Sequence, residues 1–348
     1  MVKGEKEVTI YDVARTLNVS PSTVSRALKN NPNIREETKK RIVMVAGEMG
    51  YRHNKFASNL RQKRTNTIGV VVPRLNSNFM ASAISGTEKI TSENGYGLII
   101  TQSQESWKKE MICISTLFNS RVDGLLVSLA NDTENLNHFN ILFKKDIPVI
   151  FFDRVPDCED CMGVVIDNFK AAYEMTLHLI QQGCKKIMHL GGNMLRNVYA
   201  ERLRGYKQAL DENGIEYRHD LVRIGDMSTK AGIDLARNII RMKHRPDAIF
   251  TSNDTSAVAA IVELKKAGID IPGDIAVAGF NNEPVCQFVS PNLTTVDYPA
   301  KKMGEIAVNL LLERLNNPAN TTSRTIVLKH ELVIRESTMK KSIKIRNK

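Results

Sequence analysis

The sequence predicts an α/β protein that carries a small all-α domain at its N-terminus, and three observations support this. The segment Val8 to Leu28 contains two short amphipathic helices separated by a three-residue turn. Residues 1–64 hold 14 Lys and Arg against 6 Asp and Glu, a net charge of +8, whereas residues 65–334 hold 29 against 31. From Asn66 onward, short apolar runs alternate with helical patterns, as in parallel sheets covered on both faces.

The first predicted helix follows Thr9, which is placed to cap it. Ile10, Val13, Ala14 and Leu17 recur at steps of three and four residues. This spacing places them on one helical face, which can pack inward.

The second predicted helix begins with Ser20 as N-cap and Pro21 at the first helical position, where a missing N–H costs nothing. Val24, Ala27 and Leu28 are expected to face the first helix. The remaining side chains form a compact polar and cationic surface: Pro21, Ser22, Ser25, Arg26 and Lys29. Two such helices with this surface are typical of a helix-turn-helix that reads the major groove of DNA.

A third helix is predicted from Arg35 to Met49, ending at Gly50. After it, Asn54 can cap a short helix that reaches about Arg61, with Phe56, Ala57 and Leu60 on one stripe. A helix of about eight residues is marginal in water, so we expect it to need a partner.

The part of the chain from Asn66 onward is predicted to form two α/β lobes, because its length of about 280 residues is enough for two such lobes instead of one. The predicted strands are Ile68 to Val72, Leu98 to Ile100, Gly124 to Val127, Val149 to Phe152, Ile187 to Leu190, Ala248 to Thr251 and Ile275 to Ala278. The predicted helices are Ala81 to Asn94, Phe169 to Gln182, Arg202 to Asn213, Lys230 to Met242 and Thr255 to Ala267.

Three segments in this order, TIYDVARTLNVSPSTVSRAL, GYRHNKFASNLR and TIGVVVP, resemble the lactose-repressor (LacI-type) transcription regulators. The resemblance extends over essentially the whole chain. It implies a helix-turn-helix headpiece (1–52), a hinge helix and linker (53–64), an effector-binding and dimerisation core (65–338) and a basic tail (339–348). The core would be two Rossmann-like lobes, similar to periplasmic sugar-binding proteins. The first would hold about 65–165 and 293–322, the second about 166–292 and 323–338, with Arg324 to Arg335 returning to the second.

The resemblance also implies roles for individual DNA-binding residues. Pro21, Ser22 and Arg26 would lie over base edges, and Leu60 would enter the minor groove and kink the duplex, with Arg61 beside it. The family commonly has Pro where this chain has His53, so ordering of the hinge should cost more entropy. The remaining candidates for contact with the duplex are Thr9, Tyr11, Ser20, Thr23, Ser25, Lys29, Tyr51, Asn54 and Ala57.

Polar residues at the ends of predicted strands are the candidates for a ligand site, because ligands of open α/β sheets lie beyond the carboxyl ends of the strands. Asp153, Asn253 and Asn281 each follow a strand, and Arg202 is expected to open a helix. By resemblance, Arg202, Asn253 and Asn281 would line an effector cleft, with Phe79 and Met227 as apolar walls. Many sugar-responsive members have Asp where this chain has Asn281, and some have an aromatic platform where it has Met227.

Cysteine and histidine patterns do not indicate metal or redox chemistry. Cys158 and Cys161 form a lone CxxC in an acidic loop, whereas structural zinc needs two more ligands. The odd number of cysteines, with no signal peptide and no long apolar segment, predicts a cytoplasmic protein with no membrane partner.

Three functions remain open: a ligand-controlled dimeric regulator that binds operator DNA, a sugar-binding receptor, and a Rossmann-type enzyme. The N-terminal headpiece disfavours the receptor. The chain lacks GxGxxG, Walker and GxSxG motifs, which disfavours an enzyme, and no cofactor is expected. The expected partners are double-stranded operator DNA, a sugar or related small-molecule effector, and a second copy of the chain.

Overall fold

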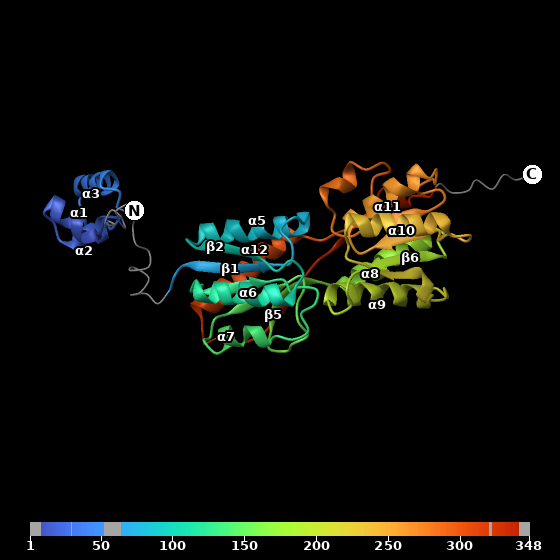
Figure 1. The fold of residues 1–348 in the computed structure, drawn as a ribbon, viewed down its shortest axis with the longest axis horizontal. Helices are drawn as coiled ribbons and strands as arrows, with labels where there is room; N and C mark the ends of the chain where they lie inside the picture. The colour runs from blue at the N-terminus through green and yellow to red at the C-terminus, as the bar shows by residue number, and fades with distance from the viewer. Residues whose placement is uncertain (1–7, 29, 52–63, 320–321, 341–348) are drawn as a thin grey trace, which may run out of the picture. The chain divides into compact units, whose positions relative to one another are not determined.

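The computed structural model describes residues 8–28, 30–51, 64–319 and 322–340, and the chain divides into two compact units, Met1–Thr65 and Asn66–Lys348 (Figure 1). Each unit has apolar clusters of its own.

The N-terminal unit is a three-helix bundle of α1 (Ile10–Leu17), α2 (Pro21–Leu28) and α3 (Glu36–Glu48). Its core joins Val13 of α1, Val24 of α2 and Ile42 of α3, all at most 1% exposed. The predicted cap of α1 is confirmed, since Thr9 and Asp12 form a reciprocal capping box. Both predicted helices of the helix-turn-helix are present, and their apolar faces meet as their spacing indicates.

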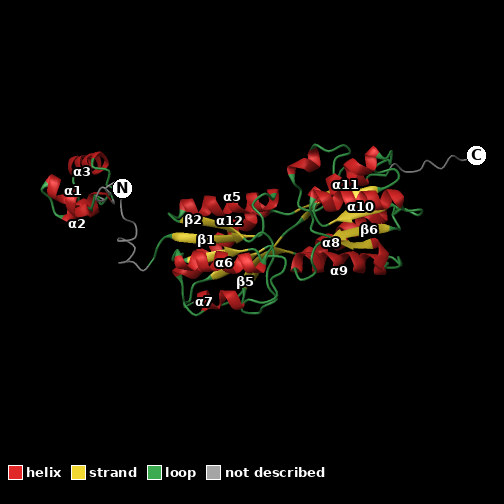
Figure 2. Cartoon of the chain, in the orientation of Figure 1, coloured by secondary structure: helices red, strands yellow, loops and turns green. Residues whose placement is uncertain are grey.

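The first lobe of the second unit is built on a six-stranded parallel sheet with the order β11-β5-β4-β3-β1-β2. Figure 2 shows this sheet as a strand layer between helices. The strands are β1 (Thr67–Val72), β2 (Gly97–Gln102), β3 (Gly124–Val127), β4 (Val149–Phe152), β5 (Met162–Ile166) and β11 (Thr325–Leu328). The helices are α5 (Asn78–Glu93), α6 (Trp107–Asn119), α7 (Asn140–Phe143) and α12 (Ala300–Asn316).

Side chains of successive strand residues point to opposite faces of the sheet, and they show that α5 and α12 cover one face and α6 the other. Ile68, Val70 and Val72 of β1 belong to the core that α5 and α12 cover, whereas Val71 packs with α6. Helices α5 and α12 approach closely at Gly86, where an added Cβ would lie 2.0 Å from the carbonyl oxygen of Lys301.

The second lobe has a four-stranded parallel sheet with the order β7-β6-β8-β9. Helices α8 and α9 pack together on one face, and α10 and α11 on the other (Figure 1). The strands are β6 (Ile187–Gly191), β7 (Val222–Ile224), β8 (Ala248–Thr251) and β9 (Ala276–Ala278). The helices are α8 (Asn168–Gln181), α9 (Asn197–Glu212), α10 (Thr229–Arg241) and α11 (Asp254–Lys266).

The chain passes between the lobes three times, and the last passage corrects a prediction. The return of Arg324 to Arg335 to the second lobe is wrong for its first part, because β11 pairs in parallel with β5 at the edge of the first sheet. The return follows β11, where β12 (Glu331–Val333) pairs with β10 (Thr295–Asp297). Sequence alone did not reveal that β5 leaves an edge that β11 can cover.

Three helices, α6, the short α7 and α12, and one disulfide were not predicted. In α12, Leu310, Leu311 and Leu312 are all buried, so burial on several sides obscures the helical period. In α6, buried Glu110 interrupts the apolar face. Cys158 and Cys161 form a disulfide in the loop between β4 and β5.

Among the described residues, no helix has the length and apolar character needed to cross a bilayer.

Candidate functional site

The predicted DNA-reading surface lies at the start of α2. Ser20 accepts a hydrogen bond from the backbone N–H of Thr23 at 3.1 Å, which makes it the cap that the sequence predicts. Its hydroxyl also lies 2.7 Å from that of Ser22. Arg26, one turn further, is exposed, and no carboxylate of the described residues forms an ion pair with it. Tyr11 of α1 is 66% exposed. This surface offers hydroxyl groups and an available cation.

Part of the predicted DNA surface cannot be located. Lys29, Asn54, Ala57, Leu60 and Arg61 lie outside the described residues, as does His53. Thr9, Pro21, Thr23, Ser25 and Tyr51 are described, and each is exposed or half-buried in the bundle. Thr9 is engaged in the capping box of α1.

A cavity of about 290 Å³ lies between the two lobes, and the six residues predicted for the effector cleft all line it. Phe79 and Asp153 come from the first lobe, and Arg202, Met227, Asn253 and Asn281 from the second. The strand-end rule therefore predicted residues that the fold brings together from distant parts of the chain.

Arg202 is a buried guanidinium fixed on three sides. Its Nε donates to Oδ1 of Asn168 at 2.9 Å and its Nη1 to the carbonyl of Ser252 at 2.7 Å. The guanidinium carbon lies 3.6 Å from the ring centre of Phe280. Burial lowers its pKa. Arg202 lies within α9, which begins at Asn197, so the prediction that it opens the helix is wrong.

Asp153 provides a buried carboxylate on the opposite lobe. Its Oδ1 accepts from the Tyr298 hydroxyl at 2.9 Å and its Oδ2 from Ser128 at 3.4 Å. Burial raises its pKa, against the opposing effect of Arg154 and Arg202.

Four of the lining residues have left-handed backbones: Glu105 at φ 61°, Asp153 at φ 59°, Met227 at φ 59° and Asn281 at φ 112°. Such conformations are costly for residues other than glycine and concentrate at functional sites.

Asn253 lines the cavity and also caps a helix. Its Oδ1 accepts from the backbone N–H of Ser256 and so caps α11, while its Nδ2 donates to the carbonyl of Met227 at 2.8 Å. Its amide therefore keeps one N–H and one lone pair for a ligand. Met227 is a buried wall residue and belongs to the core of the second lobe.

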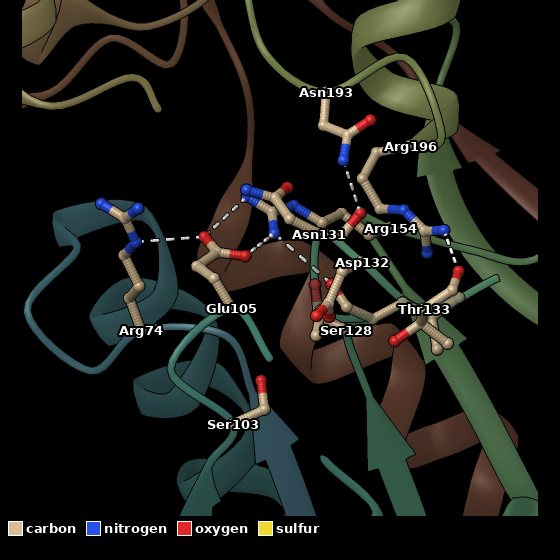
Figure 3. Close-up of polar contacts among 12 residues, drawn as sticks. Arg74, Ser103, Glu105, Ser128, Asn131, Asp132, Thr133, Arg154, Asn193 and Arg196 are labelled. Atoms are coloured by element: carbon tan, nitrogen blue, oxygen red, sulfur yellow. Dashed lines mark hydrogen bonds and ion pairs between the residues drawn. The ribbon is translucent and has the colours of Figure 1, made fainter. Parts of the chain in front are cut away.

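The most prominent polar group at the cavity was not predicted. Glu105, which follows β2, holds two arginines: its carboxylate forms a two-pronged pair with Arg154 at 2.6 and 3.3 Å and contacts Nε of Arg74 at 3.1 Å (Figure 3). Arg154 also donates to the hydroxyl of Tyr199 in the second lobe at 3.2 Å. Arg74 reaches the carbonyl of Asp226, also in the second lobe. The sequence holds a partial signal, because Arg74, Glu105 and Arg154 all follow strand ends.

Further hydrogen bonds join the lobes beside this cluster. Asn193 Nδ2 donates to the carbonyl of Asn131 at 2.9 Å, and Arg196 donates to the carbonyl of Thr133 (Figure 3). Asn197 donates to the carbonyl of Asp153 and accepts from the N–H of Val155. Hydrogen bonds thus join the two lobes at the cavity, together with an apolar cluster to which both lobes contribute, and a change of ligand can rearrange these hydrogen bonds.

Two family models match the chain. One describes bacterial regulatory proteins of the lacI family and matches residues 9–54. The other describes a periplasmic binding protein-like domain and matches residues 176–338.

Full-length relatives extend the likeness beyond these segments. The catabolite control protein A of Priestia megaterium is 32% identical over 332 residues, which cover 95% of this chain and 99% of that protein. A structure described as a complex of the transcriptional regulator CelR with cellobiose is 27% identical, with a TM-score of 0.72 over 95% of this chain and 100% of that one. The lac repressor dimer bound to operator and the anti-inducer ONPF is similar in fold, with a TM-score of 0.84 at 23% identity over 96% of this chain and 100% of that one.

Proposed function

The chain belongs to the LacI family of bacterial regulatory proteins, and on that premise we propose that it is a repressor that binds a palindromic operator as a homodimer, under control of a sugar or sugar derivative. As a family member it is a DNA-binding transcriptional regulator with an effector-binding core. The observation that carries the finer proposal is the polar cavity that both lobes line, in a chain that also has an available cationic helix-turn-helix surface.

On the DNA side, Pro21, Ser22 and Arg26 read base edges in our proposal, and Tyr11 and Ser20 contact phosphates. The hydroxyl groups at the start of α2 and its helix N-terminus support the phosphate contacts. Leu60 acts as the minor-groove wedge in this proposal, which here rests on the family resemblance.

On the ligand side, the effector binds between the lobes and changes how tightly they close. Arg202, Asp153 and Asn281 supply its polar contacts, with Phe79 and Met227 as apolar walls. Because the polar contacts between the lobes flank the cavity, a ligand that alters them changes the relation between the two halves of each subunit. In a dimer, this change alters the spacing of the two headpieces on the operator.

The proposal is tested by gel shift of the full-length protein on fragments of its genome, repeated over a range of salt concentrations. We expect retention of specific fragments, about a hundredfold weaker specific binding for Arg26→Ala, and little change for Lys207→Ala, which removes a charge from the second lobe. Absence of any specifically retained fragment would refute the regulator. A sugar that binds the protein without changing operator affinity would refute the control mechanism.

A further inference from the structure

Glu283 is a buried carboxylate at the wall of the cavity that neither sequence reasoning nor the family resemblance singled out. It lies between β9 and β10, is 7% exposed and lines the cavity. Its Oε2 accepts from the Thr255 hydroxyl at 3.1 Å. The side chains of Asn78 and Asn281 lie near it, where they favour its ionised form, and both residues line the same cavity. Asn78 begins α5 in the first lobe, so Glu283 lies where the two lobes meet at the cavity.

The polar residues around Glu283, which are Thr255, Asn78 and Asn281, are all uncharged. Among the described residues no Lys, Arg or His forms an ion pair with Glu283, in contrast to Glu105, which holds two arginines. A second buried carboxyl, Asp254, accepts from the backbone N–H of Glu283 at 2.8 Å. Burial raises the pKa of Glu283, and burial raises that of Asp254 to about 7. Glu283 at the cavity wall and Asp254 buried behind it are therefore two neighbouring carboxyls that form no ion pair with a cation among the described residues.

Arg202 shows the reverse situation, a buried cation without a paired carboxylate. Its guanidinium is hydrogen-bonded to the neutral oxygens of Asn168 and Ser252, and no ion pair with a described carboxylate is present. The lining as a whole contains three arginines (Arg74, Arg154, Arg202) and four carboxylates (Glu105, Asp153, Asp226, Glu283). Such a lining disfavours a strongly anionic ligand and leaves Glu283 as the carboxylate that most lacks a cation.

We propose that the effector is an amino sugar whose ammonium group contacts Glu283, while its hydroxyl groups lie toward Arg202 and Asp153. This inference rests on the proposed function, because it specifies the ligand of the same cleft. An ammonium group has three donors, which match the carboxylate of Glu283 and the side-chain oxygens of Asn78 and Asn281. The ammonium group also carries the positive charge that a hydroxyl group lacks. Charge-assisted hydrogen bonds to a carboxylate are strong in a buried site such as that of Glu283. The volume of about 290 Å³ is at the lower end for ligand pockets and favours a monosaccharide.

The test compares D-glucosamine, D-galactosamine and D-mannosamine with their neutral parent sugars and N-acetyl derivatives, by calorimetry on the full-length protein at pH 7. At least one amino sugar should bind at least tenfold more tightly than its neutral parent. The Glu283→Gln variant, which keeps the size and an acceptor oxygen, should lose this preference. The matched control Glu216→Gln, an exposed carboxylate outside the cavity, should keep it.

A second variant keeps the test independent of how Glu283→Gln folds. Asn281→Asp adds a carboxylate beside Glu283 and should increase the preference for the amino sugar. A neutral sugar that binds as tightly as its amino counterpart would overturn the inference, as would an amino-sugar preference that survives in Glu283→Gln. Binding of no sugar at all would also overturn it. Operator binding, measured by gel shift on the same preparations, shows separately whether the proposed function stands.

Discussion

Replacement of Arg202 by methionine tests how one side chain serves both the fold and the cleft. Methionine keeps most of the length and the apolar stem but removes the guanidinium. The carbonyl of Ser252 and Oδ1 of Asn168 then lose their donors, and Phe280 loses the cation above its ring.

The expected magnitude follows from these contacts. Each buried acceptor left without a donor costs about 1–3 kcal/mol, and the desolvated contact with Phe280 contributes about 2 kcal/mol. Removing a buried charge offsets part of this loss, since burial already lowers the pKa of Arg202. We expect a net decrease of about 2–4 kcal/mol in the free energy of unfolding of the core.

Urea denaturation followed by fluorescence measures the stability change, and calorimetry with the effector measures the binding change. Effector binding should weaken by about a hundredfold or more, while operator affinity without effector stays near that of the wild type. A stability change below about 0.5 kcal/mol with unchanged effector binding would refute the role that we assign to Arg202.

Three further outcomes are expected. Gly205→Ala should lower the free energy of unfolding by about 3 kcal/mol in urea denaturation, because its Cβ would lie 2.1 Å from the carbonyl oxygen of Phe169; an unchanged midpoint would contradict this. Glu105→Gln removes two ion pairs, so effector titrations should show about tenfold weaker binding, and an unaltered Kd would count against the interlobe role. Burial raises the pKa of Asp254 from 3.8 to about 7, so the folded state keeps a proton that the unfolded chain releases. Thermal unfolding should therefore show stability falling between about pH 4 and pH 7, and Asp254→Asn should flatten this slope; an equal slope in both proteins would exclude Asp254 as its source.

Local patterns were sufficient for much of the fold. Runs such as Val149 to Phe152 are buried on both faces, so they are continuously apolar and easily recognised as strands. Caps were equally readable, because Thr9 and Ser20 act on residues three positions away. The place of β11 was not readable, since it depends on which sheet edge remains free after distant segments have paired.

The same distinction applies to the cleft. Asp153 and Asn281 follow strands directly, and the rule for open sheets locates them without knowledge of their partners. Glu105 matters because it pairs with Arg74 and Arg154, and Glu283 because it forms no ion pair with a described cation. The two arginines, and Thr255 that donates to Glu283, are 28 or more positions away in the chain. Pairing over such distances is a property of the folded arrangement, so sequence patterns alone did not indicate it.

The order in which the chain is synthesised gives the discontinuous first lobe a particular folding problem. Its strands β1 to β5 emerge early, but α12, which covers Leu126 and Ile150, and the edge strand β11 follow only after the second lobe has been made. At about 5–20 residues per second, the interval of more than 100 residues leaves this apolar sheet face uncovered for several seconds or longer. The second lobe has most of its sheet and helices in one continuous stretch, so it can fold first. The nascent first lobe is therefore the stage at which we expect chaperones to bind and aggregation to begin.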